Sequence, residues 1–306
     1  MKRLQKRIAE GGSTLLAAAV FALLVWLQAG LVTQQLWMQL LLFVASVYLL
    51  IELSNQNALL RVRSRMVSTT FIMLSCTACF LFPELRGGIV QLCFVASYLM
   101  LFQTYQDRQS VRPAYYAFVC LSMASLPFVQ VLWYVPLIWV MMGVQLQSLS
   151  WRTWLASLLG LLTPYWFAML WLIYLSDFTP ALDHFSQLAC FSMSPQMPST
   201  GIVLAVCFTA IMSAIGIVHF WSYSFEDKIR IRLLYGLFTT MTIVTLLLIL
   251  LQPQHHAVLM RIAIVNASPL IAHVLTFTNS RLSNWLFFLA AGIAVGITAY
   301  NLWMPS

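Results

Sequence analysis

Long apolar runs separated by short polar connections dominate the pattern of this chain. A helix needs about 20 apolar residues to cross about 30 Å of hydrocarbon. Helices are expected because an open sheet edge in lipid leaves backbone groups unpaired, and no alternating barrel pattern is visible. The runs predict eleven spans, at residues 13–32, 37–53, 67–82, 89–102, 114–126, 131–146, 154–175, 200–220, 233–251, 262–277 and 285–303. We therefore predict an all-α polytopic membrane helix bundle that forms a single transmembrane domain over residues 1–306.

The fifth and sixth spans lie in one continuous apolar run, residues 114–147, for which a single long tilted helix is the alternative. Pro127 and Gln130 near its middle predict a turn, because an interior proline loses a hydrogen bond and clashes with the preceding turn. Each half is short for a full crossing, so both a complete hairpin and a re-entrant element remain open.

The positions of Lys and Arg predict how the chain is threaded, because short basic loops stay on the cytoplasmic side of a membrane. With residues 114–147 as a hairpin, fourteen of the sixteen basic residues fall on one side, and only Arg86 and Arg261 fall on the other. A single helix would flip every later loop and give a split of ten to six. The charge pattern therefore favours the hairpin, with the N-terminus inside and the C-terminus outside.

The first span has a second interpretation, because Lys2, Arg3, Lys6 and Arg7 precede it as they would precede a secretory signal. Its apolar stretch is longer than a usual signal core, and no clean cleavage site of small residues follows. We expect this span to be retained, although the charge pattern would be the same after cleavage.

Composition supports a membrane protein. Apolar residues make up 61% of the chain and charged residues 8%, whereas soluble proteins have about 25% charged residues. The net charge of +8 does not indicate nucleic-acid binding, because the basic residues are scattered between the spans. The cysteines lie mostly inside apolar runs, and Cys76 and Cys79 have no histidine nearby. We predict neither a metal site nor a cofactor.

The basic connection between the second and third spans is the first candidate site. Arg61, Arg63 and Arg65 there could hold a phosphate or a phospholipid head group, because guanidinium groups match phosphate oxygens. If the connection were helical, Arg61 and Arg65 would share one face. The alternative is a topology anchor on anionic lipid, worth about 1 kcal/mol per basic residue. Glu52 could pair with one of these arginines.

The tenth span is the second candidate site, because a polar residue inside a membrane is a functional hypothesis by default. Asn266 and His273 lie two turns apart on one face, and Pro269 loosens the helix between them. A small substrate or lipid group could bind there. The alternative is a kinked helix whose polar side chains bond to neighbouring helices. His219 in the eighth span is expected at the membrane interface.

No catalytic residue set is predicted. The outward connections collect polar residues that we interpret as solvated loop residues, and the acid and histidine among them form adjacent pairs rather than a helical ligand pair. The first outward connection, residues 33–36, contains no acid, which counts against lipid-linked-sugar transferases with a carboxylate there. The outward polar residues are Glu84, Arg86, Asp177, Asp183, His184, His255, His256 and Arg261.

Three stretches carry a resemblance: NALLRVRS at residues 57–64, the proline-broken hairpin, and SWRTWL at 150–155 leading to LGLLTPY at 159–165. They resemble a family of uncharacterised multi-pass inner-membrane proteins from Bacteroidetes-type bacteria. The resemblance implies an inner-membrane location and no transferable activity. Arg61, Arg63 and Arg152 are the charged positions within these stretches, which makes them the first choices for functional importance.

Three functional hypotheses follow. The first is a cell-envelope assembly component that handles or organises a lipid-linked or polysaccharide precursor, with anionic phospholipid or polyprenyl phosphate as its partner. The second is a permease for a small uncharged substrate that uses Asn266 and His273. The third is a non-catalytic subunit that packs against other membrane proteins. Nucleic acid is not expected as a partner.

Overall fold

The computed structural model describes residues 11, 13–62, 64–176, 178–189, 199–278 and 281–304. Within these ranges the regular structure is helical and no strand occurs. Twelve α-helices are described there: α2 (Ser13–Gln28), α3 (Trp37–Asn57), α4 (Met66–Thr77), α5 (Leu85–Leu101), α6 (Val111–Ser125), α7 (Tyr134–Val144), α8 (Trp151–Leu175), α9 (Thr179–Ala189), α10 (Thr200–Tyr223), α11 (Ile229–Leu251), α12 (His256–Phe277) and α13 (Arg281–Trp303). The predicted all-α class is confirmed.

The helices are those of a multi-pass membrane protein. Seven of them, α3, α5, α8, α10, α11, α12 and α13, are long and apolar enough to cross a bilayer. Exposed aromatic side chains on α8 fit contact with lipid: Trp166 is 68% exposed and Tyr174 80% exposed. The other predicted spans coincide with the shorter helices α2, α4, α6 and α7. Eleven crossings and the orientation stay predictions.

The apolar run at residues 114–147 is broken, as the proline predicts. α6 ends at Ser125, a short 3-10 helix follows at Val129–Trp133, and α7 begins at Tyr134. The alternative of a single long helix is therefore wrong. α7 has 11 residues and rises only about 16 Å at 1.5 Å per residue, less than the hydrocarbon thickness.

One helix falls outside every predicted span. α9 (Thr179–Ala189) lies in the connection between the seventh and eighth predicted spans, which the sequence predicts as a polar loop. Its residues do not form a continuous apolar run, so a search for membrane-length segments passes over it.

Helix packing divides the chain into two compact units. Unit 1 comprises residues 1–88 and 194–306, and unit 2 comprises residues 89–193. The single transmembrane domain predicted from the sequence stays a prediction.

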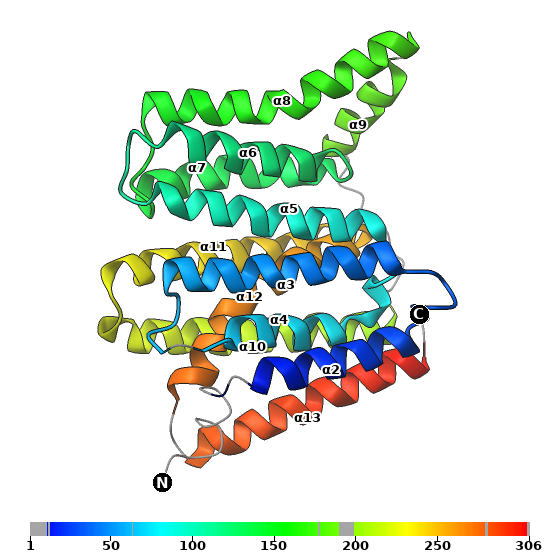
Figure 1. Ribbon diagram of the computed structural model, residues 1–306, viewed down its shortest axis with the longest axis vertical. Coiled ribbons are helices and arrows are strands. Elements are labelled where there is room, and N and C mark those ends of the chain that lie inside the picture. The colour runs from blue at the N-terminus through cyan, green and yellow to red at the C-terminus, as the bar shows by residue number, and fades with distance from the viewer. Residues whose placement is uncertain are drawn as a thin grey trace. The chain divides into compact units, whose positions relative to one another are not determined.

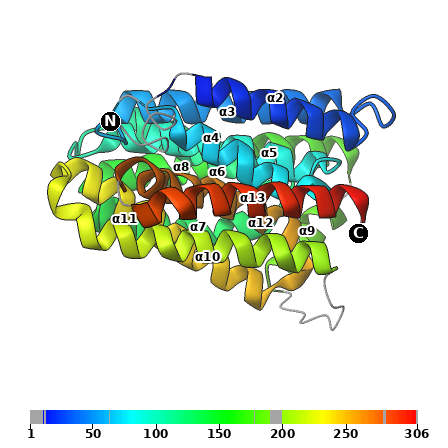
Figure 2. The ribbon, with the colours of Figure 1, turned by 90° about the horizontal axis from the view of Figure 1, so that it is seen from below.

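Unit 1 is built around α12, which is buried over most of its length. α12 packs against α4, α10 and α11. α2, α3 and α13 pack against α4, and Figure 2 shows α13 between α4 and α10. Close approach is possible because Gly216 on α10 lies against the backbone of Leu270, where a Cβ would be only 3.1 Å from that residue's carbonyl carbon.

Unit 2 is organised by the pair α6 and α8, which lie side by side (Figure 1). Gly160 on α8 faces the α6 backbone, and a Cβ there would lie 2.5 Å from the carbonyl oxygen of Tyr115. The Nε1–H of Trp139 on α7 donates to Ser157 on α8 at 2.9 Å. Ser150 caps the start of α8 through a reciprocal pair of bonds with Thr153.

Most buried hydroxyl groups are satisfied within their own helix. Ser46, Thr242 and Thr245 each donate to the carbonyl four residues earlier. These residues therefore need no ligand, and a polar residue type inside an apolar helix is not by itself a sign of function here.

The close α6–α8 contact gives the first prediction. Gly160→Ala forces the helices apart and lowers the free energy of unfolding by about 1–3 kcal/mol, measured as thermal unfolding of the purified protein in detergent. Gly143→Ala on α7 is the matched control, because its Cβ meets nothing closer than Leu149 Cδ2 at 3.6 Å. Equal stability of the two variants would contradict this account of the packing.

Candidate functional site around Asp227

Asp227 lies at the junction of α10 and α11. A short 3-10 helix (Ser224–Glu226) follows α10, and the Asp227 N–H donates to the Ser224 carbonyl at 3.0 Å. Lys228 then begins α11 as its N-cap. The backbone at Asp227 is extended, and its side chain is only 1% exposed. A carboxylate buried to this degree requires partners, because removing a charge from water costs several kcal/mol.

Two basic side chains from distant parts of the chain are those partners. Oδ1 of Asp227 accepts a hydrogen bond from Nε of Arg61 at 2.5 Å, and Oδ2 lies 3.1 Å from Nε2 of His273. Arg61 belongs to the connection between α3 and α4, whereas His273 lies on α12. The carboxylate therefore joins three segments that are far apart in sequence.

A second histidine extends the cluster outward. Nδ1 of His273 lies 3.4 Å from Nδ1 of His219 on α10. Because a carboxylate only accepts hydrogen bonds, Nε2 of His273 carries a proton, which leaves its Nδ1 as an acceptor when the ring is neutral. His273 is fully buried, whereas His219 is half-buried. Arg61, His219, Asp227 and His273 are called the Asp227 cluster below.

Aromatic rings enclose the cluster. The rings of Phe220, Tyr235 and Phe277 lie 5.7, 5.2 and 4.7 Å from the ring of His273 between centroids. The Arg61 guanidinium lies 4.9 Å over the ring of Phe277, a cation–π distance. These rings exclude water, so the bonds to Asp227 act in a medium of low dielectric constant.

The surrounding connections are strongly basic. Arg230 Nη2 donates to Oδ1 of Asn57 at 2.9 Å, which joins the end of α3 to the start of α11. Lys228, Arg230 and Arg65 are exposed, and 32% of the Arg61 side chain is exposed. Exposed cations thus lie close to the cluster in the chain, while the Asp227 carboxylate is buried.

The connection that carries Arg61 is not helical. α3 ends at Asn57, and Ala58 takes the left-handed conformation at φ 47°, usually reserved for glycine, with its N–H bonded to Asn55 O. Arg65 is the N-cap of α4, and its carbonyl accepts from Thr69 Oγ1. The shared helical face expected for Arg61 and Arg65 is therefore absent, and only Arg61 of this pair reaches Asp227.

The remaining predicted site residues lie apart from the cluster. Asn266 is buried on α12, and its Nδ2 lies 3.4 Å from Thr245 Oγ1 on α11. Arg152 is exposed on the first turn of α8 in unit 2, where it lines a cleft with Arg112, Tyr115 and Tyr116. Arg63 lies outside the described residues.

The interpretation of Arg261 as a solvated outward residue is wrong. Arg261 is only 7% exposed, and its Nη2 donates to the carbonyl oxygens of Leu81 and Glu84. His184 on α9 is half-buried in unit 2, where its Nε2 lies 3.4 Å from the Tyr165 hydroxyl. Burial lowers the pKa of His184 below its usual value.

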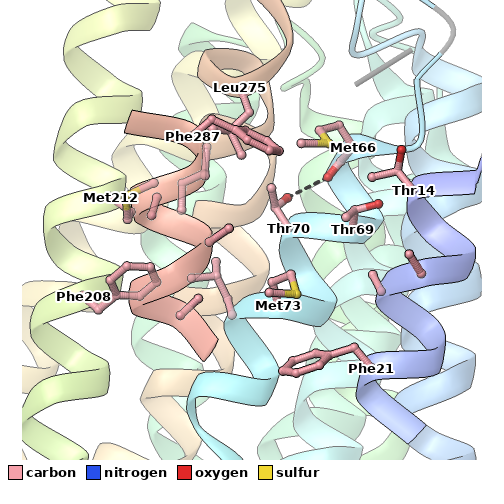
Figure 3. Close-up of a pocket in the computed structure, with 17 residues that line it drawn as sticks. Thr14, Phe21, Met66, Thr69, Thr70, Met73, Phe208, Met212, Leu275 and Phe287 are labelled. Carbon is pink, nitrogen blue, oxygen red and sulfur yellow. Dashed lines mark hydrogen bonds between the residues drawn. The ribbon is translucent and has the colours of Figure 1, made fainter. Parts of the chain in front are cut away.

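An apolar cavity of about 300 Å³ lies in unit 1 between α2, α4, α10, α12 and α13 (Figure 3). Met66, Leu275 and Phe287 lie on its wall. The polar side chains on the wall are threonines, and the hydroxyl of Thr70 has the carbonyls of Met66, Val67 and Ser268 within hydrogen-bond distance as acceptors for its one proton. The cavity therefore suits hydrocarbon rather than a hydrophilic solute.

The cavity and the Asp227 cluster share a wall. Leu60, beside Arg61 in the chain, forms a buried apolar group with Met66, and Phe277 packs against this group. The Arg61 guanidinium lies over the ring of Phe277, and Met66 lines the cavity. This buried apolar group thus lies between the basic, half-exposed site and the apolar cavity.

Asp227, the centre of the site, is not among the residues predicted from the sequence. A signal was present, because Glu226 and Asp227 are acids in a connection otherwise rich in Lys and Arg. An acid beside a predicted span is a candidate partner for a histidine within it. Among the described residues, no three His, Cys, Asp or Glu side chains are grouped as they would be to hold a metal ion.

Comparisons with models of protein families, with curated proteins and with solved structures give no match to this chain. The resemblance to inner-membrane proteins of Bacteroidetes-type bacteria stays a prediction from the sequence.

The buried carboxylate gives the second prediction. Asp227→Ala leaves the buried His273 and the partly exposed Arg61 without their shared acceptor and lowers the free energy of unfolding by about 3 kcal/mol. Combining it with Arg61→Met costs less than the sum of the two single changes, because the second change removes one of the orphaned groups. Chemical unfolding of the four proteins measures this coupling. Asp183→Ala, at an exposed position, is the control and is expected to change the free energy of unfolding little. An equally small change for Asp227→Ala would contradict the ion-paired role of Asp227.

Proposed function

We propose that this chain is a multi-pass bacterial inner-membrane protein that binds an anionic, long-chain lipid at the Arg61 end of unit 1. The class of ligand is a lipid-linked precursor such as a polyprenyl phosphate, and the role is in assembly of the cell envelope. The observation that carries the proposal is the shared wall between the Asp227 cluster and the apolar cavity.

Charge supports the position of the phosphate. Arg61, Arg65, Lys228 and Arg230 are exposed or half-exposed cations in the connections at this end of unit 1. Guanidinium groups bind phosphate oxygens with charge-assisted hydrogen bonds. The connections that meet here, after α3, α10 and α12, are also those that the charge pattern predicts on the cytoplasmic side, where anionic head groups attract basic residues.

Burial supports the position of the hydrocarbon. The cavity wall is apolar, and Thr69 and Thr70 bond to backbone carbonyls, so an incoming chain would leave no polar group unsatisfied. A permease for a small uncharged substrate that uses Asn266 and His273 would need these two residues to face a cavity. Neither Asn266 nor His273 lines this one.

Loss of the guanidinium tests the head-group site. Arg61→Gln is expected to weaken binding of polyprenyl phosphate by about tenfold or more, because it removes charge-assisted hydrogen bonds worth about 1.5–3 kcal/mol. Arg61→Lys keeps the charge and is expected to lose less. Binding is measured with the purified protein in nanodiscs of neutral lipid. Arg108→Gln, an exposed arginine of unit 2, is the control, and binding that is indifferent to Arg61 would disprove the site.

Filling the cavity tests the hydrocarbon site separately. Ala291→Phe places a ring in the cavity and is expected to weaken binding of a polyprenyl phosphate about tenfold, as for two lost CH₂ contacts of about 0.8 kcal/mol each. Binding of a short-chain phosphate that ends at Arg61 should not change. Val295→Phe on the same helix is the control, because Val295 is 45% exposed and does not line the cavity. Equal losses for both lipids would show that the ring acts elsewhere.

A further inference from the structure

The Asp227 carboxylate occupies the place at Arg61 that an anionic ligand would take. Nε of Arg61 is bonded to Oδ1 of Asp227 at 2.5 Å. A phosphate that binds the same guanidinium brings a second negative charge close to a carboxylate that is only 1% exposed. Two anions so placed repel each other strongly in a medium of low dielectric constant. Binding therefore favours any event that adds a positive charge on the inner side of Asp227.

The inner side of Asp227 carries groups that can take up a proton. Oδ2 is bonded to His273, and His273 lies 3.4 Å from His219. Imidazole is the side chain that most often changes charge between about pH 5 and pH 8. His219 is half-buried and stacks on Tyr223 with ring centroids 4.6 Å apart, so the chain of bonds runs from the buried carboxylate toward a group that water can reach.

The other groups around His273 are less suited than the two imidazoles to take up a proton. Arg61 remains cationic at physiological pH. Tyr235 of α11 is fully buried and contacts the ring of His273, and α12 and α10 add the apolar rings of Phe277 and Phe220. From α4, the side chain that bonds to α12 is the hydroxyl of Thr70. Lys228 and Arg230 follow Asp227 in the chain as exposed cations. The two imidazoles are thus the titratable groups beside Asp227 whose charged form a bound phosphate would stabilise.

We propose that binding of an anionic lipid phosphate at Arg61 is coupled to uptake of one proton by the Asp227–His273–His219 chain. This inference rests on the proposed function and adds its regulation. The acid form of the buffer gives up the proton at His219, and one new N–H bond forms on the imidazole pair while the bond from the proton to the buffer breaks. Asp227 then pairs with an imidazolium, and the Arg61 guanidinium is released to the phosphate.

The coupling has a definite sign. A ligand whose binding takes up a proton binds more tightly as the pH falls, and by the same amount the bound ligand favours the protonated protein. A phosphomonoester would obscure this effect, because it loses negative charge near pH 6. Phosphatidylglycerol is the better probe, since its phosphodiester keeps one charge across the range.

The test measures phosphatidylglycerol binding to the full chain in phosphatidylcholine nanodiscs at about pH 8 and about pH 6. The wild-type protein is expected to bind on the order of tenfold more tightly at the lower pH, within the usual range for coupled sites. Asp227→Asn removes the competing charge, so binding should be tight and independent of pH. His273→Gln should bind weakly at both values. His255→Gln, at the opposite end of α12, should behave as the wild type does.

Calorimetry on the wild-type protein provides a measurement that needs no variant. Titration at about pH 7 in two buffers of different ionisation enthalpy is expected to show a net uptake of up to about half a proton per lipid bound, which is the largest average uptake that a tenfold coupling allows. Tight binding with no proton uptake, or a pH dependence that survives Asp227→Asn, would overturn the coupling and leave the lipid site standing. Absence of binding at both pH values would overturn the lipid site and the coupling together.

Discussion

The ion-paired carboxylate of Asp227 is the interaction on which the arrangement of unit 1 depends. A buried charge is tolerated only when its partners are well placed, and here one carboxylate uses both oxygens, one for Arg61 and one for His273. The two partners come from segments separated from Asp227 by 166 and 46 residues. Holding all three together brings the end of α3, the junction of α10 and α11, and the end of α12 to one end of the unit (Figure 1). The fold and the site are consequently decided by the same contacts.

The surroundings of this cluster separate charge from hydrocarbon over a short distance. Phe277 contacts Arg61 and the apolar group of Leu60 and Met66, so these aromatic and aliphatic side chains lie between the basic site and the cavity. An amphipathic ligand needs a charged site next to an apolar cavity, whereas few small solutes need both. This is why lipid binding accounts for more of the geometry than transport of a polar molecule does.

α12 shows how a polar helix is accommodated inside an apolar unit. Three of its polar side chains have a nearby partner from another part of unit 1: Arg261 bonds to carbonyls in the connection after α4, Asn266 approaches Thr245, and His273 joins the cluster. Helices α4, α10 and α11 supply these partners or cover them. Polar groups in lipid are stabilised mainly by other helices, and only at His273 does the partner belong to a network of ionisable groups. That difference distinguishes a candidate site from structural polarity.

The sequence by itself determined the helical class, the positions of the long apolar helices and the break after Ser125, because backbone hydrogen bonding in lipid leaves few alternatives and proline interrupts a helix locally. It also indicated Arg61 and His273 as separate candidates, since charges beside and inside a span are costly. It did not indicate that the two meet, nor that Asp227 joins them. Whether a loop carboxylate turns inward depends on the left-handed turn at Ala58 and on the packing of α10, α11 and α12, which are set by contacts between distant residues. The same contacts give Asn266 and His273 different partners, Thr245 and Asp227, although a helical repeat places the two residues on one face. Only the tertiary structure decided these points, because a pairing between residues far apart in the chain has no periodicity from which it can be predicted.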